Sequence, residues 1–378
     1  MGLAFLSALI GAVVWLTWDV LLAWFSHKAG AIQATRLPKP SITVVLCVRN
    51  GQHHLEQWLE AAKGWNVPIV VVDDESTPPL KVTQDGVHVF RLTGSKPGKK
   101  DAVSLGIRMA STEWVAFTDV DCRPSADWLE ALLARVGEHT EVVIGVSLPT
   151  EGDGPSLALV DALSVARRYA AAVGMGRPYM GVGRNLAYRK DGFPGFERHA
   201  HLASGDDDLL VQDWPARKGI RRSDQIRFSF HNVPTFAPST RSSWRRMKRR
   251  HLTTGTAYPT WVLLVLALPS LGAMLYFLGT CGLWIEWMWM AKPNHAPAAT
   301  VDARSVLHIA LWIVHVGGAF AWLVHVLTFR LFATQCGLKG LAVWGGVLQP
   351  AVFLEQLAAT ARVTWESRFG LRNPPTDW

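Results

Sequence analysis

The sequence lacks the cysteine patterns of disulfide-stabilised and zinc-binding proteins. Its four cysteines are widely spaced along 378 residues and form no C-x-x-C motif: Cys47, Cys122, Cys281 and Cys336. We therefore predict neither a disulfide framework nor a zinc site. The chain also has no P-loop, no G-x-G-x-x-G motif, no internal repeat and no low-complexity tract. With no disulfides to maintain, we expect a cytosolic environment for the soluble part of the chain.

Long apolar segments, by contrast, are abundant. Hydrophobic residues make up 49% of the chain, and the 18 tryptophans are of a type that gathers where membranes meet water. Residues 1–27 have no Lys or Arg at their start, and no A-x-A site follows, so we predict an uncleaved anchor rather than a signal peptide. Asp19 within it is costly in lipid and is expected to face protein or the interface.

Further apolar segments lie in residues 258–360. Two of them, starting near residue 258 and covering 306–329, are long enough to span a bilayer. A weaker segment at 340–359 contains Pro350 and Glu355, and we expect it to be re-entrant or interfacial rather than spanning.

Basic residues predict the orientation of the chain. The net charge is +8, a dense basic run occupies residues 241–257, and a basic tail follows at 361–378. Because Lys and Arg favour the cytoplasmic side, we predict a multi-pass protein of the inner (cell) membrane with its soluble domain in the cytoplasm. A basic run directly before a span is typical of binding to anionic lipid headgroups. It has no aromatic platform for bases beyond Trp244, so membrane lipids, not nucleic acid, are the expected partner.

Residues 40–240 read as an α/β domain. "SITVVLCV", "PIVVV" and "EWVAFT" are short, continuous apolar runs typical of strands buried on both faces. "GQHHLEQWLEAAKG" and "KKDAVSLGIRMAS" have helical spacing between them. This alternation predicts a Rossmann-like, mostly parallel sheet with helices on both faces. Ligands of such sheets bind beyond the carboxyl ends of the strands.

Polar residues follow all three predicted strands. Arg49 follows the first, Asp73 and Asp74 the second, and Asp119 and Asp121 the third. In an extended chain, Asp119 and Asp121 point to the same side, about 7 Å apart at roughly 3.3 Å per residue. Two such carboxylates suit a hard divalent cation, Mg²⁺ or Mn²⁺. Any one of these stretches is also compatible with an ordinary polar turn or a helix cap.

In order and spacing, these and later motifs resemble family 2 glycosyltransferases. The resemblance covers about residues 42–255 and rests on "CVRN", "VVDDEST", "GKKDAVSLGIRMA", "FTDVDCRPSADWL", "GVGRNLAYRKDGF", "SGDDDLL" and "SWRRMKRRHLTTG". It implies the GT-A nucleotide-diphospho-sugar transferase fold, held here between N-terminal and C-terminal transmembrane helices. It also implies transfer of a sugar from a nucleotide sugar, usually with inversion and a divalent metal.

The resemblance assigns roles to individual positions. Asp73 or Asp74 is expected to read the nucleobase, and Asp119 and Asp121 to hold the metal and diphosphate. Asp207 is expected to be the general base, with Asp206 as the alternative. The other expected members of the site are Arg49, Lys99, Lys100, Gly183, Asn185, Arg250 and His251.

The sequence departs from the family pattern in its basic run. Met247 stands where relatives carry Gln, and His251 stands where they carry Trp in a Q-x-x-R-W pattern. These differences place the acceptor side of the site in question. The acid stretch also departs, because Gly205-Asp206-Asp207 replaces Thr-Glu-Asp, yet an acid remains at the base position.

The stretch "SGDDDLL" at residues 204–210 has a structural alternative. Ser204 as the N-cap of a helix and Asp207 at its third position would form a capping-box-like pair. Acids in a first turn also suit the helix dipole. On that hypothesis the aspartates stabilise a helix and take no part in chemistry.

Together these features predict an inverting hexosyltransferase that moves a sugar from a UDP-sugar to a hydroxyl of a membrane lipid. The membrane segments and the basic entrance favour a lipid acceptor at the inner leaflet. Two alternatives stay open: a subunit of a processive polysaccharide synthase, and a non-catalytic membrane scaffold that binds a nucleotide sugar.

Overall fold

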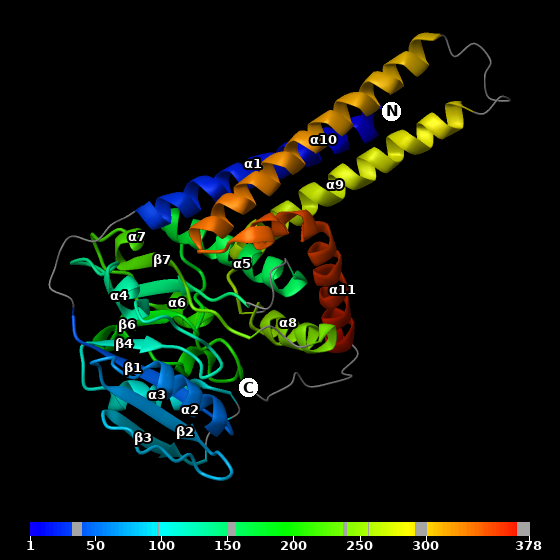
Figure 1. Cartoon of the computed structure of the whole chain (residues 1–378). Coiled ribbons are helices and arrows are strands. Elements are labelled where there is room, and N and C mark those ends of the chain that lie inside the picture. The colour runs from blue at the N-terminus through cyan, green and yellow to red at the C-terminus, as the bar shows by residue number, and fades with distance from the viewer. Residues whose placement is uncertain are drawn as a thin grey trace. The chain divides into compact units, whose positions relative to one another are not determined.

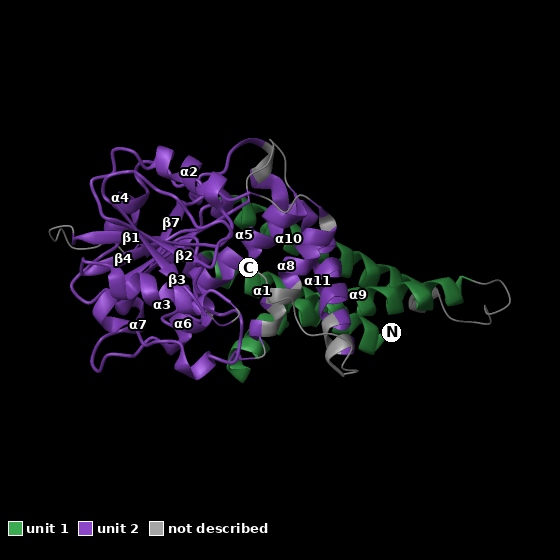
Figure 2. Ribbon diagram, turned by 90° about the horizontal axis from the view of Figure 1, so that it is seen from below, with its two compact units in different colours: residues 1–23, 259–331 green, residues 24–258, 332–378 purple. Residues whose placement is uncertain are grey.

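The computed structural model describes residues 1–31, 40–94, 96, 98–149, 156–236, 240–255, 257–291 and 301–368. The chain divides into two compact units (Figure 2). One unit comprises Met1–Ala23 and Pro259–Leu331, and the other comprises Trp24–Tyr258 and Phe332–Trp378.

The first unit contains α9 (Thr260–Met290) and most of two other long apolar helices, α1 (Gly2–Ala31) and α10 (Val301–Gln335). In the part of the chain that the structure describes, these are the three helices long and apolar enough to cross a membrane. At about 1.5 Å per residue, each exceeds the roughly 30 Å of a bilayer's hydrocarbon core. The three predicted spans are therefore confirmed as membrane-spanning candidates.

Close packing and polar contacts join these helices. A Cβ atom at Gly279 of α9 would lie 2.4 Å from the backbone nitrogen of Ala8, so this crossing requires a residue without a side chain. Asp19 is 2% exposed, and its carboxylate lies 2.9 Å from Nδ1 of His325. The expectation that Asp19 faces protein is correct, and the pairing also gives His325 a packing role.

The second unit is centred on a seven-stranded sheet in the order β3-β2-β1-β4-β6-β5-β7 (Figure 1). Strands β1 to β4 are mutually parallel, and β5 and β7 are parallel to each other, while β6 runs antiparallel to β4 and β5. The prediction of a mostly parallel sheet is confirmed. The strands are β1 (Ile42–Val48), β2 (Ile69–Asp74), β3 (Val87–Leu92), β4 (Trp114–Phe117), β5 (Val142–Val146), β6 (Leu186–Arg189) and β7 (Ile226–Asn232).

Amphipathic helices cover the sheet because their apolar faces match its fully buried strands. Every residue of β1, β2, β4 and β5 is buried. Gly106 of α3 lies so close to β1 that a Cβ atom there would sit 2.3 Å from Cγ1 of Val45. The helices of this unit before residue 240 are α2 (Gln52–Ala61), α3 (Lys100–Met109), α4 (Trp128–Leu133), α5 (Leu157–Gly174), α6 (Asp208–Asp213) and α7 (Arg222–Gln225), with short 3₁₀ turns η1 (Lys190–Gly192) and η2 (Glu197–His199).

Two further helices complete this unit: α8 (Arg241–Gly255), which holds the basic run, and α11 (Gln349–Arg368), which follows the 3₁₀ segment η4 (Gly340–Leu348) and packs against both α5 and α8. Figure 1 shows α8 and α11 side by side. Arg245 of α8 binds the buried Glu355 of α11 through nitrogen–oxygen distances of 2.9 and 3.1 Å. Lys248 of α8 lies 2.8 Å from the buried carboxylate of Asp161 in α5.

These ion pairs correct part of the sequence interpretation. We expected most cations of the basic run to hold lipid headgroups, but Arg245 and Lys248 bind acids of the protein. Glu355, which makes residues 340–359 a poor span, forms one of these pairs. Among the described residues this segment is not one of the candidate spans, and the expectation that it does not cross stays a prediction.

Candidate active site

The carboxyl ends of β1, β2 and β4 meet at one edge of the sheet. Val48 pairs with Asp73, and Val45 pairs with Phe117, so the residues that follow these strands emerge together. The chain passes from β1 to β2 and β3 on one side, and then returns to β4 on the other side. Such a reversal of strand order leaves a crevice, which is where doubly wound sheets bind ligands.

The turns after β1 and β2 are bonded to each other. Asn50 adopts a φ of 56° and Glu75 a φ of 57°, a region that costs non-glycine residues energy and is enriched at functional sites. The backbone nitrogen of Asn50 donates to the Ser76 hydroxyl at 2.9 Å. Its side-chain oxygen accepts from Thr77 at 2.8 Å. Arg49 lies 3.5 Å from Glu75 and 3.9 Å from Asp74, so it belongs to this edge.

Asp73 and Asp74 have different surroundings. The carboxylate of Asp73 accepts the backbone N–H groups of Ser76 (2.9 Å) and Leu80 (3.2 Å) and the Arg91 guanidinium (2.7 Å). Burial opposes the charge of Asp73, but these partners outweigh it and lower its pKa. Asp73 therefore stabilises the turn, and Asp74, fully buried beside Arg49, is the better candidate for nucleobase binding.

The two acids that follow β4 lie near two basic side chains, those of Lys99 and Arg184. Lys99, at the start of α3, forms an ion pair with Asp119. Burial alone would lower the pKa of Lys99, but Asp119 and other neighbouring groups raise it, so the ammonium stays charged. Asp121 has a raised pKa because of burial first and then the charge of Asp119, and the charge of Arg184 counteracts both.

Asp119 and Asp121 fit a divalent cation. Repulsion between the two carboxylates contributes to the raised pKa of Asp121, and a bound cation would relieve that repulsion. Among the described residues, they do not belong to a cluster of three or more potential ligands. Mg²⁺ and Mn²⁺ commonly complete such sites with water and substrate phosphates.

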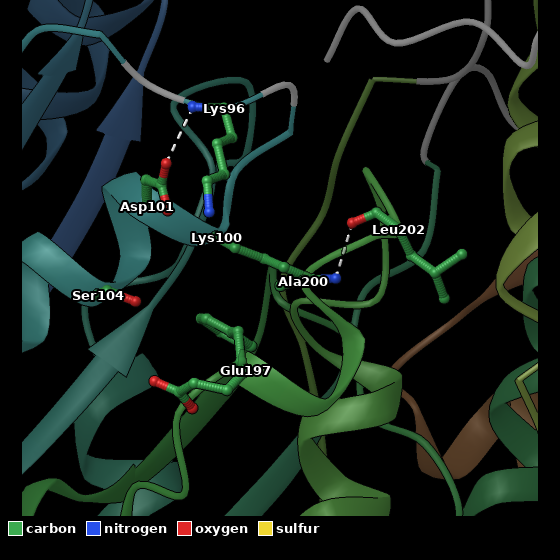
Figure 3. A pocket seen from close by; sticks show the side chains of 8 residues that line it. Lys96, Lys100, Asp101, Ser104, Glu197, Ala200 and Leu202 are labelled. Atoms are coloured by element: carbon green, nitrogen blue, oxygen red, sulfur yellow. Dashed lines mark hydrogen bonds between the residues drawn. The ribbon is translucent and has the colours of Figure 1, made fainter.

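Lys100 acts in the fold instead of facing the paired acids. Its ammonium donates to the carbonyl oxygens of His199 at 2.6 Å and Leu202 at 2.8 Å. Figure 3 shows this side chain reaching across a cavity of about 150 Å³ between α3 and residues 196–202. Lys100 thus holds the start of α3 against the segment that leads to the three aspartates.

Residues 204–208, which we call the acid turn, lie against Gly183 of "GVGRN". The backbone N–H of Gly183 donates to Oδ2 of Asp207 at 2.8 Å. Asp206 lines a small cavity of about 10 Å³ together with Lys99 and Gly183. The structure therefore brings Asp206, Asp207, Gly183 and Lys99 together.

The helix alternative for this stretch is wrong in its details. Helix α6 begins at Asp208, with Asp207 as its N-cap residue. Ser204 does not cap it, because its hydroxyl bonds with the hydroxyl of Thr254 at 2.7 Å. Asp207 accepts the N–H of the next residue, Asp208, at 2.8 Å, whereas a capping box bonds the second or third helical N–H.

The two aspartates that flank Asp207 have raised pKa values. Burial, followed by the charge of Asp207, raises the pKa of Asp206 to about 6 and that of Asp208 to about 7. Burial and the neighbouring charge thus disfavour the ionised form of both carboxyls.

Asn185 is used by the core. Its Nδ2 donates to the carbonyl oxygens of Val146 (2.7 Å) and His231 (2.8 Å), and its Oδ1 accepts from the Trp128 indole at 2.9 Å. The residue is fully buried. Its side chain is therefore committed to joining β5, β7 and α4, and not to lining a donor sugar.

The sequence was compared with models of known protein families. The model of glycosyl transferase family 2 matches residues 43–194, which contain β1 to β6 and both acids after β4. Residues 43–194 are therefore similar to glycosyltransferase family 2.

Relatives of the family 2 domain were found in sequence and in structure. The chain is 34% identical over 122 residues to the pre-mycofactocin glycosyltransferase of two Mycobacterium tuberculosis strains, covering 30% of this chain and 25% of the relative. It thus spans about a quarter of the length of these curated relatives. The structure of mannosyltransferase PcManGT from Pyrobaculum calidifontis, in complex with GDP-Man and Mn²⁺, aligns with a TM-score of 0.51 and 14% identity. That alignment covers 96% of this chain and 99% of the other, and it shows that the GT-A fold is shared.

The basic pair expected after the family 2 domain lies in α8. His251 is exposed on this helix. Arg250 also belongs to α8, but its side chain lies outside the described residues.

Two residues near the site of the family 2 domain escaped the sequence reasoning. Arg184 stands between the nominated Gly183 and Asn185 and acts electrostatically on Asp121. Its place inside "GVGRN" was the available signal. Tyr258 donates to Asp208 at 2.6 Å, and at the start of an apolar segment it carried no signal of its own.

Proposed function

We propose that this chain is an inverting glycosyltransferase that moves a sugar from a nucleotide sugar to a hydroxyl group of a membrane lipid. One observation carries the proposal. Lys99, Asp119, Asp121 and the acid turn converge at the carboxyl edge of the parallel strands of a family 2 domain.

The reaction joins the acceptor oxygen to the anomeric carbon of the donor sugar. The bond from that carbon to the diphosphate oxygen breaks, and its electron pair leaves with the nucleoside diphosphate. The acceptor proton goes to a carboxylate, for which Asp207 is the candidate. Its oxygens accept bonds from Gly183 and Asp208, yet each carboxylate oxygen has a second lone pair.

Positive side chains would receive the developing charge of the diphosphate. Lys99 and Arg184 provide two such charges beside the paired acids. Asp119 and Asp121 would hold Mg²⁺ or Mn²⁺, which supplies further neutralisation of the diphosphate when bound. Asp74 and Arg49 are the proposed contacts of the nucleotide at the neighbouring strand ends.

The donor is proposed to be a UDP-sugar, on the resemblance of the sequence motifs. The solved neighbour in complex with GDP-Man makes a GDP-sugar the first alternative to test. The three candidate spans support a lipid acceptor, and the basic run of α8 supports action at the inner leaflet with the second unit in the cytoplasm.

A donor screen tests this function. The purified full chain is incubated with UDP- and GDP-sugars and a total membrane lipid extract, and released nucleoside diphosphate is measured together with labelled lipid. One sugar per acceptor with equal diphosphate release supports the proposal. Long products would indicate a polysaccharide synthase subunit, and binding without release would indicate a non-catalytic scaffold.

A further inference from the structure

The acid turn is held from two sides. On one side, Gly183 donates to Asp207. On the other side lie Thr254 and Tyr258, which belong to the end of α8 and to the short segment before α9 begins at Thr260. All of these contacts fall within the second unit, Trp24–Tyr258 and Phe332–Trp378.

Tyr258 makes a short hydrogen bond to the acid turn. Its hydroxyl donates to Oδ2 of Asp208 at 2.6 Å, while Oδ1 of Asp208 accepts the N–H of Leu209 at 2.8 Å. Burial and the charge of Asp208 raise the pKa of Tyr258, so its hydroxyl remains a donor. The ring of Tyr258 packs edge-on against Tyr179, with centroids 5.9 Å apart, which fixes its direction.

A second contact fixes the start of the acid turn. The Ser204 hydroxyl bonds with that of Thr254 at 2.7 Å. Gly205 has a φ of 93°, and a Cβ atom there would lie 2.6 Å from Leu209 and 3.2 Å from Thr254. The turn is therefore packed closely on residue 254 in a conformation that favours glycine.

These contacts leave Asp207 between two anchors. Its own carboxylate is tied to Gly183, and the next residue is tied to Tyr258. Because a loss of about 1 Å in placement can reduce a reaction rate strongly, release of either anchor would matter to a general base.

We infer that Tyr258 is a positioning residue which, through its hydrogen bond to Asp208, orients Asp207 toward the acceptor hydroxyl. This inference rests on the proposed function. It also makes the placement of the base depend on the segment through which the chain enters its second apolar span.

Tyr258→Phe tests the inference, since it removes the hydroxyl and keeps the ring. In the full-length protein we expect kcat for sugar transfer to fall roughly ten- to a hundredfold, the usual effect of losing a hydrogen bond to a charged group. The KM for the nucleotide sugar should stay within about twofold. Tyr276→Phe is the matched control, because it removes a hydroxyl that lies 3.4 Å from the Val314 carbonyl oxygen in the membrane-spanning helices, and kcat should not change.

A double-mutant cycle separates positioning from general damage. If Tyr258 acts through Asp208, adding Tyr258→Phe to Asp208→Ala should cause little further loss. Fully multiplicative losses would overturn the inference, and so would an unchanged kcat in Tyr258→Phe.

Amide hydrogen exchange keeps the inference testable if the donor or acceptor has been misassigned. Tyr258→Phe should speed exchange across residues 205–209, and Tyr276→Phe should not. Absence of transfer by the wild type would contradict the proposed function alone. Unchanged exchange at residues 205–209 would contradict the positioning role alone.

Discussion

Three adjacent aspartates occupy three different environments in this protein. Asp206 borders a small cavity with Lys99, Asp207 binds the backbone of Gly183, and Asp208 binds Tyr258. Each therefore has its own partner, and the mutual repulsion is offset by separate contacts. This arrangement explains how a basic, apolar chain keeps "DDD" together.

At the residue scale, the account predicts a requirement for a divalent cation. Excess EDTA should abolish sugar transfer, and added Mn²⁺ or Mg²⁺ should restore it. Asp121→Asn should reduce Mn²⁺ affinity while the fold survives, since it removes one charge at nearly constant shape. Asp191→Asn, at an exposed site, serves as the control for Mn²⁺ titrations of the purified protein. Full activity in EDTA would contradict the assignment.

A second residue-scale prediction concerns pH. The pKa of Asp206 is raised to about 6 in the folded protein, mainly by burial. Its ionisation therefore opposes folding increasingly as the pH rises from about 4 through 6, and fully above that range. Asp206→Asn should raise the thermal midpoint clearly at pH 7.5 and little at pH 4.5. The exposed Asp85→Asn should show no such difference, and equal shifts at both pH values would count against the burial of Asp206.

The sequence predicted where the candidate site residues lie along the chain, but it did not predict which way their side chains point. The apolar run before Asp119 and Asp121 correctly placed both acids after a strand. The chain there is not extended as their spacing suggested, because β4 ends at Phe117 and the N–H of Cys122 donates to the carbonyl oxygen of Asp119 at 3.0 Å in a turn. Asn185 and Lys100 looked equally functional. Their partners lie 39 and 99 residues away in the chain, at Val146 and His199, and no local pattern predicts such contacts.

At the scale of elements, three strands with continuous apolar runs were predicted from the sequence, and the other four were not. β1, β2 and β4 are fully buried, as their continuous runs of apolar residues predicted. β3 lies at the sheet edge with a mixed burial pattern, and β6 has only four residues. The antiparallel insertion of β6 between β4 and β5 depends on long-range pairing, to which rules for parallel crossovers do not apply.

Helix α8 gives a prediction at the same scale. Arg245→Ala would remove the guanidinium that binds Glu355, which is 7% exposed, and should cost at least about 1 kcal/mol of unfolding free energy. Arg246, exposed on the same helix, is the matched control, and Arg246→Ala should leave the thermal midpoint unchanged. The charge swap Arg245→Glu with Glu355→Arg should recover part of the loss. Equal midpoints for the two alanine variants would mean that the pair does not hold α8 to α11.

At the scale of the whole molecule, hydropathy predicted the three candidate spans, but not what joins them. Asp19 and His325 are 306 residues apart, so only the folded chain brings them together. The hydropathy of a span can be computed from its own residues, whereas the contacts between spans depend on the tertiary structure.

Membrane orientation is the whole-molecule prediction. If the second unit faces the cytoplasm, a cysteine in place of Ser243 in α8 should not react with a membrane-impermeant maleimide added to intact cells. The same cysteine should react after the cells are opened. Ready labelling from outside would overturn the proposed orientation.

The central claim is that the acid turn provides the base for glycosyl transfer. The most direct test compares purified wild type and Asp207→Asn for transfer of a labelled sugar from its nucleotide to lipid. We predict that the variant keeps nucleoside diphosphate affinity and its thermal midpoint, and transfers roughly 10²–10⁴-fold more slowly, the usual contribution of a positioned base. Near-normal transfer by Asp207→Asn, with a lowered thermal midpoint, would show instead that Asp207 only caps α6.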